Sequence, residues 1–215
     1  MDDQSSNIPW PTEKFSRLTE DERASRLQKV LNNRPEGPLW IFAFGSLMWN
    51  PCFEYDRCEE ALFEGWERKF HIWATVSRGT MERPGLGLCL EKGDGACKGL
   101  AYRLLPENEE IEWQVIWNRE MNTGVYNAIW AALTLQSGEV VNALTFVVDP
   151  THSQYAGGMP IPVMSEVIAG ATGEYGRCRD YLASTVEEMA KLGVVDEYLN
   201  SLLTAVDAQM ESNAD

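Results

Sequence analysis

The sequence predicts a single α+β domain built on a mixed, strongly curved sheet or barrel. Apolar, aromatic-rich runs typical of strands fill the middle of the chain, helical patterns dominate its end, and one helical window separates two strand pairs. A length of 215 residues is enough to bury one full core. Hydrophobic residues make up 44% and charged residues 24%, which is typical of a globular protein.

The charge balance restricts the classes of partner. Asp and Glu number 33 against 18 Lys and Arg, so the formal net charge is -15. Such a field repels nucleic-acid backbones and anionic membranes, and an anionic substrate must therefore meet local donors. The start, Met1 to Gln4, lacks the features of a signal peptide, and no apolar run approaches the length of a membrane span. We expect a cytoplasmic protein with no nucleic-acid or membrane partner.

The five cysteines are not arranged for metal binding. They form no CxxC pair, and only His71 and His152 are available to join them at a metal. An odd count in a reducing compartment indicates free thiols. Cys89 and Cys97 flank an expected hairpin turn and are predicted to pack across it, and no cysteine is assigned any chemistry.

The N-terminal part of the chain is predicted to be an arm followed by a capped helix. Residues 1 to about 18 are polar and contain proline, and Trp10 and Phe15 are the side chains expected to dock. Thr19 and Glu22 form a capping-box pattern that predicts a helix start. The helix should end at the two prolines of 34–38, after an apolar face of Ala24, Leu27, Val30 and Leu31. It is expected to lie outside the barrel or sheet.

The stretch from Leu39 to Trp49 is the most informative. Apolar residues run up to Gly45-Ser46, and Asn50-Pro51 closes the segment. This pattern predicts a buried strand with a sharp turn at its end, where backbone N–H groups can face an anion or a carbonyl oxygen. The Gly-Ser pair is thus a candidate ligand cradle. For a Gly-Ser pair taken alone, an ordinary turn after a core strand is the more common explanation.

Two pairs of strands are expected next, with a loop between them. Ranges 61–66 and 70–74 look like separate strands, and ranges 86–90 and 99–104 look like a hairpin turning at 92–96. The intervening loop, 77–85, contains two arginines, Arg78 and Arg83. They are local cations for an anionic ligand, although loop arginines are more often solvated surface charges.

A helix is expected from Pro106 to Met121, with Ile111, Val115 and Ile116 on its apolar face and Gly124 as its break. Glu120 lies near its C-terminal end, where the helix dipole disfavours negative charge. Taken alone, such a residue is normally solvated surface.

The remainder is predicted as a second hairpin, a loop and three helices. The hairpin covers 125–135 and 140–148, and the loop to Met159 contains His152 and Tyr155. The helices are expected at about 160–171, 176–192 and 196–209. We therefore divide the chain into an N-terminal arm and capped helix (1–38), one domain (39–209) and a flexible tail (210–215).

Several ordered motifs resemble those of the ChaC-type γ-glutamylcyclotransferases, particularly the bacterial branch. The family's opening strand runs Phe-Gly-Tyr-Gly-Ser-Leu, then an apolar residue, Trp and, two residues later, Pro. The matching segments are Phe42 to Pro51, Arg78-Gly79-Thr80, Pro84-Gly85, Gly99 to Arg103, Arg119-Glu120-Met121, Gly124, Tyr126 and Tyr155. The resemblance covers roughly residues 39 to 207. Ala43 and Phe44 depart from it, because the family usually has Gly and Tyr there, and the loss of the Tyr hydroxyl puts one hydrogen bond in doubt.

The resemblance implies a small mixed β-barrel surrounded by helices that cleaves glutathione into 5-oxo-L-proline and Cys-Gly. The α-amine of the γ-glutamyl group attacks its own side-chain carbonyl, and no cofactor or metal is needed. Glu120 falls where the family places the catalytic base. The substrate-binding residues that the resemblance implies are Ile41, Phe42, Ala43, Phe44, Gly45, Ser46, Leu47, Arg78 and Tyr155.

Other interpretations stay open at this point. A non-catalytic γ-glutamyl-binding protein on the same scaffold would follow if Ala43 and Phe44 spoil the cradle, but it has no evident need for Glu120. A cyclotransferase acting on other γ-glutamyl peptides or amines fits the same motifs. A thiol-dependent enzyme is disfavoured, because no cysteine has a helix N-terminus or a clear histidine partner. A monomer is favoured.

Overall fold

The structure is a computed structural model that describes residues 8–213, and these residues form two compact units. The barrel unit consists of Ser16–Arg68 and Leu90–Asp149. The helical unit contains Lys69–Cys89, the described residues from Pro150 onward and those before Ser16. Expectations for Met1 to Gln4, for the first residues of the arm and for the last two residues of the tail lie outside the described residues.

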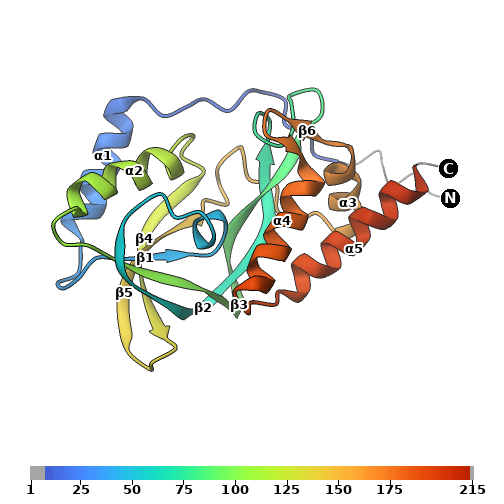
Figure 1. Cartoon of the computed structure of the whole chain (residues 1–215). Coiled ribbons are helices and arrows are strands. Elements are labelled where there is room, and N and C mark those ends of the chain that lie inside the picture. The colour runs from blue at the N-terminus through green and yellow to red at the C-terminus, as the bar shows by residue number, and fades with distance from the viewer. Residues whose placement is uncertain (1–7, 214–215) are drawn as a thin grey trace. The chain divides into compact units, whose positions relative to one another are not determined.

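The barrel unit is organised around a closed five-stranded barrel with strand order β1-β3-β2-β4-β5 (Figure 1). Its strands are β1 (Trp40–Ala43), β2 (Tyr55–Ala74), β3 (Gly85–Leu104), β4 (Tyr126–Leu135) and β5 (Val140–Val148). β1 pairs antiparallel with β3 and parallel with β5, so the sheet is mixed, as the sequence predicts. β4 and β5 form the expected hairpin, with Tyr126 opposite Val148.

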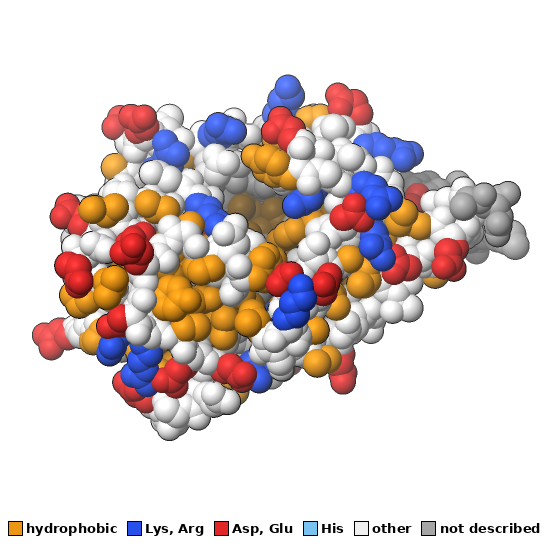
Figure 2. Space-filling model, viewed as in Figure 1, with side chains coloured by type: hydrophobic (Ala, Val, Ile, Leu, Met, Phe, Trp, Pro, Cys, Tyr) orange, Lys and Arg blue, Asp and Glu red, His pale blue; other side chains and the backbone are white. Residues whose placement is uncertain are grey.

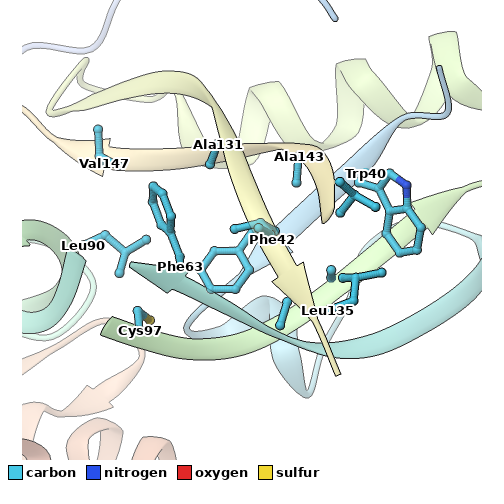
Figure 3. Packing of buried hydrophobic residues seen from close by; sticks show 13 residues of the cluster. Trp40, Phe42, Phe63, Leu90, Cys97, Ala131, Leu135, Ala143 and Val147 are labelled. Carbon is cyan, nitrogen blue, oxygen red and sulfur yellow. The ribbon is translucent and has the colours of Figure 1, made fainter. Parts of the chain in front are cut away.

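The barrel core explains why β1 is a continuous apolar run. Trp40 and Phe42 belong to a buried cluster with Phe63, Leu90 and Leu133, which Figure 3 shows at close range. The Phe42 and Phe63 rings meet edge to face, 5.8 Å apart at their centroids. The alternate residues of β1, Ile41 and Ala43, are also at most 1% exposed. A strand buried on both faces needs apolar residues at every position.

The expected hairpin at 86–104 is wrong, because this range lies within one 20-residue strand, β3. Gly93 and Gly95 lie in the predicted turn, but in the structure they leave space for the Glu67 side chain. A Cβ atom at either position would come within 2.7 Å of the Glu67 side chain, and the Gly95 N–H donates to Glu67 Oε1 at 3.0 Å. Cys89 and Cys97 therefore do not face each other across a turn.

The expected break at 67–69 is also wrong, since β2 is a single 20-residue strand. Its charged residues are accommodated by specific contacts: Glu67 covers the glycines of β3, and Arg68 is only 4% exposed. Gly65 adopts φ 77°, a left-handed conformation that glycine allows in the middle of the strand.

Helix α1 (Glu20–Asn32) begins as predicted. Thr19 and Glu22 exchange hydrogen bonds in a complete capping box. The buried face of α1 is narrower than the predicted apolar face, because Leu27 is buried whereas Ala24 is exposed. The helix lies on the outside of the barrel, where the Trp130 Nε1–H of β4 donates to the Val30 carbonyl at 3.1 Å.

Helix α2 (Glu109–Glu120) is confirmed, and Ile116 is fully buried as predicted, but the other two residues of the predicted apolar face are exposed. Ile111 is 67% exposed and Val115 is 39% exposed. Two tryptophans occupy the barrel-facing side instead: Trp113 lies edge-on to Trp130 at 6.0 Å, and Trp117 lies 6.3 Å from Phe146. Large aromatic side chains bury more area than the aliphatic ones, and they determine which face turns inward. Gly124 follows the helix with φ 78°.

The helical unit contains the three predicted helices, α3 (Ile161–Gly170), α4 (Cys178–Lys191) and α5 (Glu197–Ser212). They pack against one another, and two short strands, β6 (Thr172–Gly173) and β7 (Gly176–Arg177), connect α3 to α4. α5 runs beyond its expected end at 209. Trp10 docks as predicted, against Trp73 of the same unit, with ring centroids 5.6 Å apart.

Charged side chains are interspersed on the face shown in Figure 2, with apolar side chains between them over the barrel strands. Many of the acidic groups are paired within the barrel unit, for example Asp56 with Arg103 at 2.7 Å and Glu109 with Arg34 at 2.8 Å. Exposed pairs of this kind contribute little to stability. No helix of the described chain has the length and apolarity that crossing a membrane requires.

Candidate active site

The predicted cradle is a compact loop at the end of β1. After Ala43 the chain leaves the sheet, and a 3-10 turn, η2 (Ser46–Met48), begins directly after Gly45. The Met48 N–H donates to the Gly45 carbonyl at 2.8 Å, and the Asn50 N–H donates to the Ser46 carbonyl at 2.9 Å. We call the segment from Gly45 to Asn50 the Gly45–Asn50 loop. Because the first N–H groups of such a turn have no partner within it, those of Ser46 and Leu47 suit an acceptor from outside.

Two barrel residues fix the backbone around this loop. Arg68 donates from Nε to the Phe44 carbonyl at 2.6 Å, and its Nη2 donates to the Lys98 carbonyl. The Tyr102 hydroxyl donates to the Met48 carbonyl at 2.8 Å. Charge-assisted hydrogen bonds to backbone carbonyls are strong when the donor is buried. Side chains from β2 and β3 thus hold the backbone just before the loop, at Phe44, and within it, at Met48.

The seven predicted cradle residues divide into a strand part and a loop part. Gly45, Ser46 and Leu47 lie in the loop, and Phe44 precedes them, partly buried against the barrel core. The strand residues Ile41, Phe42 and Ala43 are almost fully buried in β1. Contact of any of the seven with substrate stays a prediction.

Glu120 is the last residue of α2, and its environment disfavours the ionised form. Its side chain is only 19% exposed. Burial raises the pKa of the Glu120 carboxyl above its ordinary value, and the Arg119 charge opposes this rise in part. The carboxylate also lies at the negative end of the helix dipole. A surface glutamate has no such environment, so the ordinary interpretation of Glu120 as solvated surface is wrong.

Arg119 connects the loop to this carboxyl group. Its Nη2 donates to Ser46 Oγ at 2.7 Å, its Nη1 donates to the Asn50 carbonyl at 3.2 Å, and its Nε lies 3.4 Å from Glu120 Oε1. One guanidinium therefore reaches both ends of the Gly45–Asn50 loop and the carboxyl group of α2. The structure brings Glu120 and the predicted cradle into one site through this side chain.

Arg78 belongs to the helical unit, where its guanidinium is already engaged. It donates from Nη1 to the Tyr175 carbonyl, and it lies over the Tyr181 ring at 5.0 Å from the centroid. The neighbouring Gly79 has no space for a side chain, since a Cβ there would lie 2.2 Å from the Gly85 nitrogen. The Arg78-Gly79 motif is thus explained in part by packing, and binding of substrate by Arg78 stays a prediction.

Tyr155 also belongs to the helical unit. It forms an isolated antiparallel bridge with Ile72 of β2, and its ring lies edge-on to His71 at 6.2 Å. The ring is therefore held by the end of a strand although Tyr155 itself lies in a loop. Its predicted contact with substrate is a further untested expectation.

Sequence reasoning gave Arg119, Arg68 and Tyr102 no role of their own. Arg119 and Tyr102 lie within segments that match the family motifs, and Arg68 lies between the two ranges that are predicted as separate strands. The signal for Arg119 was its position next to Glu120 in the last turn of a helix. No sequence signal identifies Arg68, because its importance depends on which backbone carbonyls the barrel brings near it.

The arrangement suits proton transfer beside an anion-stabilising loop. A carboxyl group with a raised pKa accepts a proton more readily than an ordinary glutamate does. The loop N–H groups, and the Arg119 guanidinium that contacts the loop, are donors for a developing negative charge. The fold and the site thus define a barrel protein with a partly buried carboxyl group that an arginine links to a glycine-containing strand end.

The comparisons with known proteins identify the family. The sequence profile described as "ChaC-like protein" matches residues 39–209, and the chain belongs to this family. It is 42% identical over 194 residues to the Escherichia coli (strain K12) protein named glutathione-specific gamma-glutamylcyclotransferase, which covers 90% of this chain and 84% of the relative. It is 27% identical to the Homo sapiens glutathione-specific gamma-glutamylcyclotransferase 1, covering 95% of this chain and 88% of that protein.

A solved structure confirms the fold. The crystal structure titled as a γ-glutamyl cyclotransferase specific to glutathione from yeast superposes with a TM-score of 0.71 at 20% identity. The superposition covers 80% of this chain and 97% of the yeast chain. The predicted fold class, a mixed barrel of the γ-glutamylcyclotransferase type with helices, is therefore correct.

Proposed function

We propose that this protein is a glutathione-specific γ-glutamylcyclotransferase that converts glutathione to 5-oxo-L-proline and Cys-Gly. Membership of the ChaC-like family and the 42% identity to the E. coli protein of that name support the substrate and the reaction. The observation that carries the proposal is the partly buried Glu120 carboxyl, which Arg119 links to the Gly45–Asn50 loop.

The reaction needs one molecule folded onto itself. The α-amine nitrogen of the γ-glutamyl group forms a bond to the side-chain carbonyl carbon, and the bond to the cysteinyl nitrogen breaks. Because both reacting atoms belong to one substrate, holding the chain in a ring-like conformation supplies much of the acceleration. We assign this task to the strand end from Ile41 to Leu47.

Glu120 acts as the base and then as the acid. The α-ammonium of glutathione is not nucleophilic, so its proton must be removed before attack. Glu120 accepts this proton and returns it to the departing cysteinyl nitrogen, and its raised pKa brings it closer to neutral pH for both transfers. After attack the ring nitrogen must lose a second proton to become the amide N–H of 5-oxoproline. Transfer of this proton to the freed cysteinyl amine leaves that amine as an ammonium, so protons and bonds balance between substrate and products, and the reaction requires no cofactor.

Backbone N–H groups at Gly45 and Ser46 stabilise the oxyanion that forms on the attacked carbonyl. Such donors are fixed before the reaction, so they require no reorganisation at the transition state. The net charge of -15 makes local donors necessary for a substrate with two carboxylates. We assign Arg78 to one of these carboxylates and Tyr155 to the walls of the binding site.

The experiment is to incubate the purified full chain with glutathione and to quantify 5-oxoproline and Cys-Gly. γ-Glutamylalanine, which has the same γ-glutamyl group but no thiol, serves as the competing substrate. Release of both products from glutathione, with a much lower kcat/KM for γ-glutamylalanine, is the expected result. No product from glutathione would contradict the function, and equal rates would contradict the specificity.

We also propose a cytoplasmic, monomeric enzyme. None of the five cysteines forms a disulfide in the described structure, which suits a reducing compartment. Light scattering of the purified protein tests the oligomeric state, and a mass near 24.2 kDa is expected. Fractionation of the source cells tests the location.

A further inference from the structure

We propose that Arg119 is a positioning residue that sets the orientation and the working pH range of the Glu120 carboxylate by tying it to the Gly45–Asn50 loop. This inference rests on the proposed function, because it assigns a role within the same site. Its geometric basis is the three-way contact of one guanidinium with Ser46 Oγ, the Asn50 carbonyl and Glu120 Oε1.

The contacts use the shape of the arginine side chain. Guanidinium groups present five N–H donors in a fixed plane, so donors on different edges reach different acceptors at the same time. Nη1 and Nη2 contact the two ends of the loop, while Nε faces the carboxyl group. An ammonium group has no comparable plane, and lysine at this position would keep the charge without the three contacts.

The contacts also restrict the loop. Ser46 is the first residue of η2, and Asn50 ends the segment before Pro51. A single side chain that binds both points fixes the loop relative to the end of α2. Since a displacement of about 1 Å costs roughly 10²-fold in rate, rigid placement of the base beside the donors is essential for the reaction.

Arg119 is also the charged group that acts on Glu120. The segment from Trp40 to Asn50 contains no titratable side chain, and Arg68 from β2 faces the Phe44 carbonyl. Within the described chain, the Arg119 charge favours the ionised form of Glu120 and so offsets part of the rise in pKa that burial causes. Without this charge the carboxylate forms only at higher pH.

The test compares Arg119→Gln, Arg119→Lys and Ser46→Ala with wild type in kcat measured across pH. Arg119→Gln should lower kcat by roughly 10²-fold and move the acid limb of the profile to higher pH. Arg119→Lys should lower kcat while leaving the limb close to that of wild type, because the charge remains. Ser46→Ala should lower kcat without moving the limb.

Arg57→Gln provides a matched control. Arg57 has a similar exposure, 29% against 30% for Arg119, and it also binds several acceptors, at Glu59 and Glu139. Arg57 lies in the barrel unit, as Arg119 does, but it does not contact the Gly45–Asn50 loop. Replacing its guanidinium should therefore leave kcat and the pH profile unchanged. A purely structural role of arginine in this unit would affect both variants alike.

A second measurement does not depend on turnover. Carboxyl ¹³C shifts of labelled glutamate, with Glu120 assigned by its absence in Glu120→Gln, report its titration directly. Glu120 should titrate at higher pH in Arg119→Gln than in wild type. If Glu120 titrates at the same pH in Arg119→Gln as in wild type, the inference about Arg119 is overturned, whether or not the protein acts on glutathione. If the titration shifts in a protein that is inactive on glutathione, the inference about Arg119 is supported and only the proposed function is refuted. If Arg119→Gln does not fold, an Arg119→Lys enzyme with wild-type kcat would overturn it.

Discussion

Arg119 and Arg78 are both arginines in family motifs, but their surroundings differ. Arg119 contacts a serine hydroxyl, a loop carbonyl and a carboxyl group that burial keeps from ionising easily. Arg78 contacts the Tyr175 carbonyl and the face of the Tyr181 ring, groups that carry no chemistry of their own. A motif match therefore does not say whether a residue serves the reaction or the packing. The contacts of its charged group distinguish the two.

The largest expected effect comes from Glu120→Gln, which keeps the shape of the side chain but removes its capacity to accept a proton. We expect kcat to fall by roughly 10²–10⁴-fold, which is about 3–5 kcal/mol of barrier. Glutathione binding should persist, because glutamine retains hydrogen-bonding atoms. Release of 5-oxoproline and calorimetric titration with glutathione measure the two effects. A folded variant with wild-type turnover would place the base elsewhere.

The thermal stability of the same variant, compared with wild type, should show how much the partly buried carboxylate destabilises the folded protein. Since the folded-state pKa of Glu120 is raised, folding is favoured most below the ordinary glutamate pKa. This contribution is lost as the pH rises through the raised folded-state pKa. The Tm of Glu120→Gln relative to wild type should therefore increase as the pH rises across that window.

Melting curves at a series of pH values test this expectation. Glu110→Gln on the exposed side of the same helix is the control, and its Tm difference from wild type should not follow that window. A Tm difference for Glu120→Gln that stays constant with pH would show that the carboxyl group is not destabilised by burial.

Arg78→Ala should have a smaller effect, which decides between binding and packing. Loss of the Tyr181 and Tyr175 contacts should lower stability by about 1 kcal/mol whatever the role in binding. If Arg78 also binds a glutathione carboxylate in both ground and transition states, KM should rise more than kcat falls. Arg83→Ala in the same loop is the control. A lower Tm with an unchanged KM would assign Arg78 to packing alone.

The smallest effect should follow modification of the cysteines. The expectation that no cysteine lies at a helix N-terminus is wrong, because Cys178 is the first residue of α4. Cys178 is buried, however, and burial raises its pKa to about 11, while burial also raises the pKa of the Cys58 thiol. These two thiols therefore form few thiolates at neutral pH. Alkylation before addition of glutathione, and the variant Cys52→Ser with Cys58→Ser, should leave turnover nearly unchanged. Complete loss of activity in a folded, alkylated enzyme would contradict a mechanism without protein thiols.

Local patterns in the sequence determined most of the elements, and together with the family motifs they supply the candidate site residues. The capping box of α1, the β4–β5 hairpin and the final three helices follow from interactions between residues close in sequence. The Gly45-Ser46 pair and Glu120 were identified through ordered family motifs. These features need no knowledge of the tertiary fold, because their signals lie within a few residues of one another.

Only the tertiary structure decided how the glycines, charges and aromatic residues were used. Gly93 and Gly95 leave space for Glu67 inside a continuous strand, although the same residues in isolation favour a turn. Trp113 and Trp117 turned α2 so that Ile111 faces solvent. The link from Arg119 to Ser46 joins residues 73 positions apart. Burial and long-range contact set these outcomes, and neither is encoded by spacing along the chain, because each depends on which distant residues the closed barrel brings together.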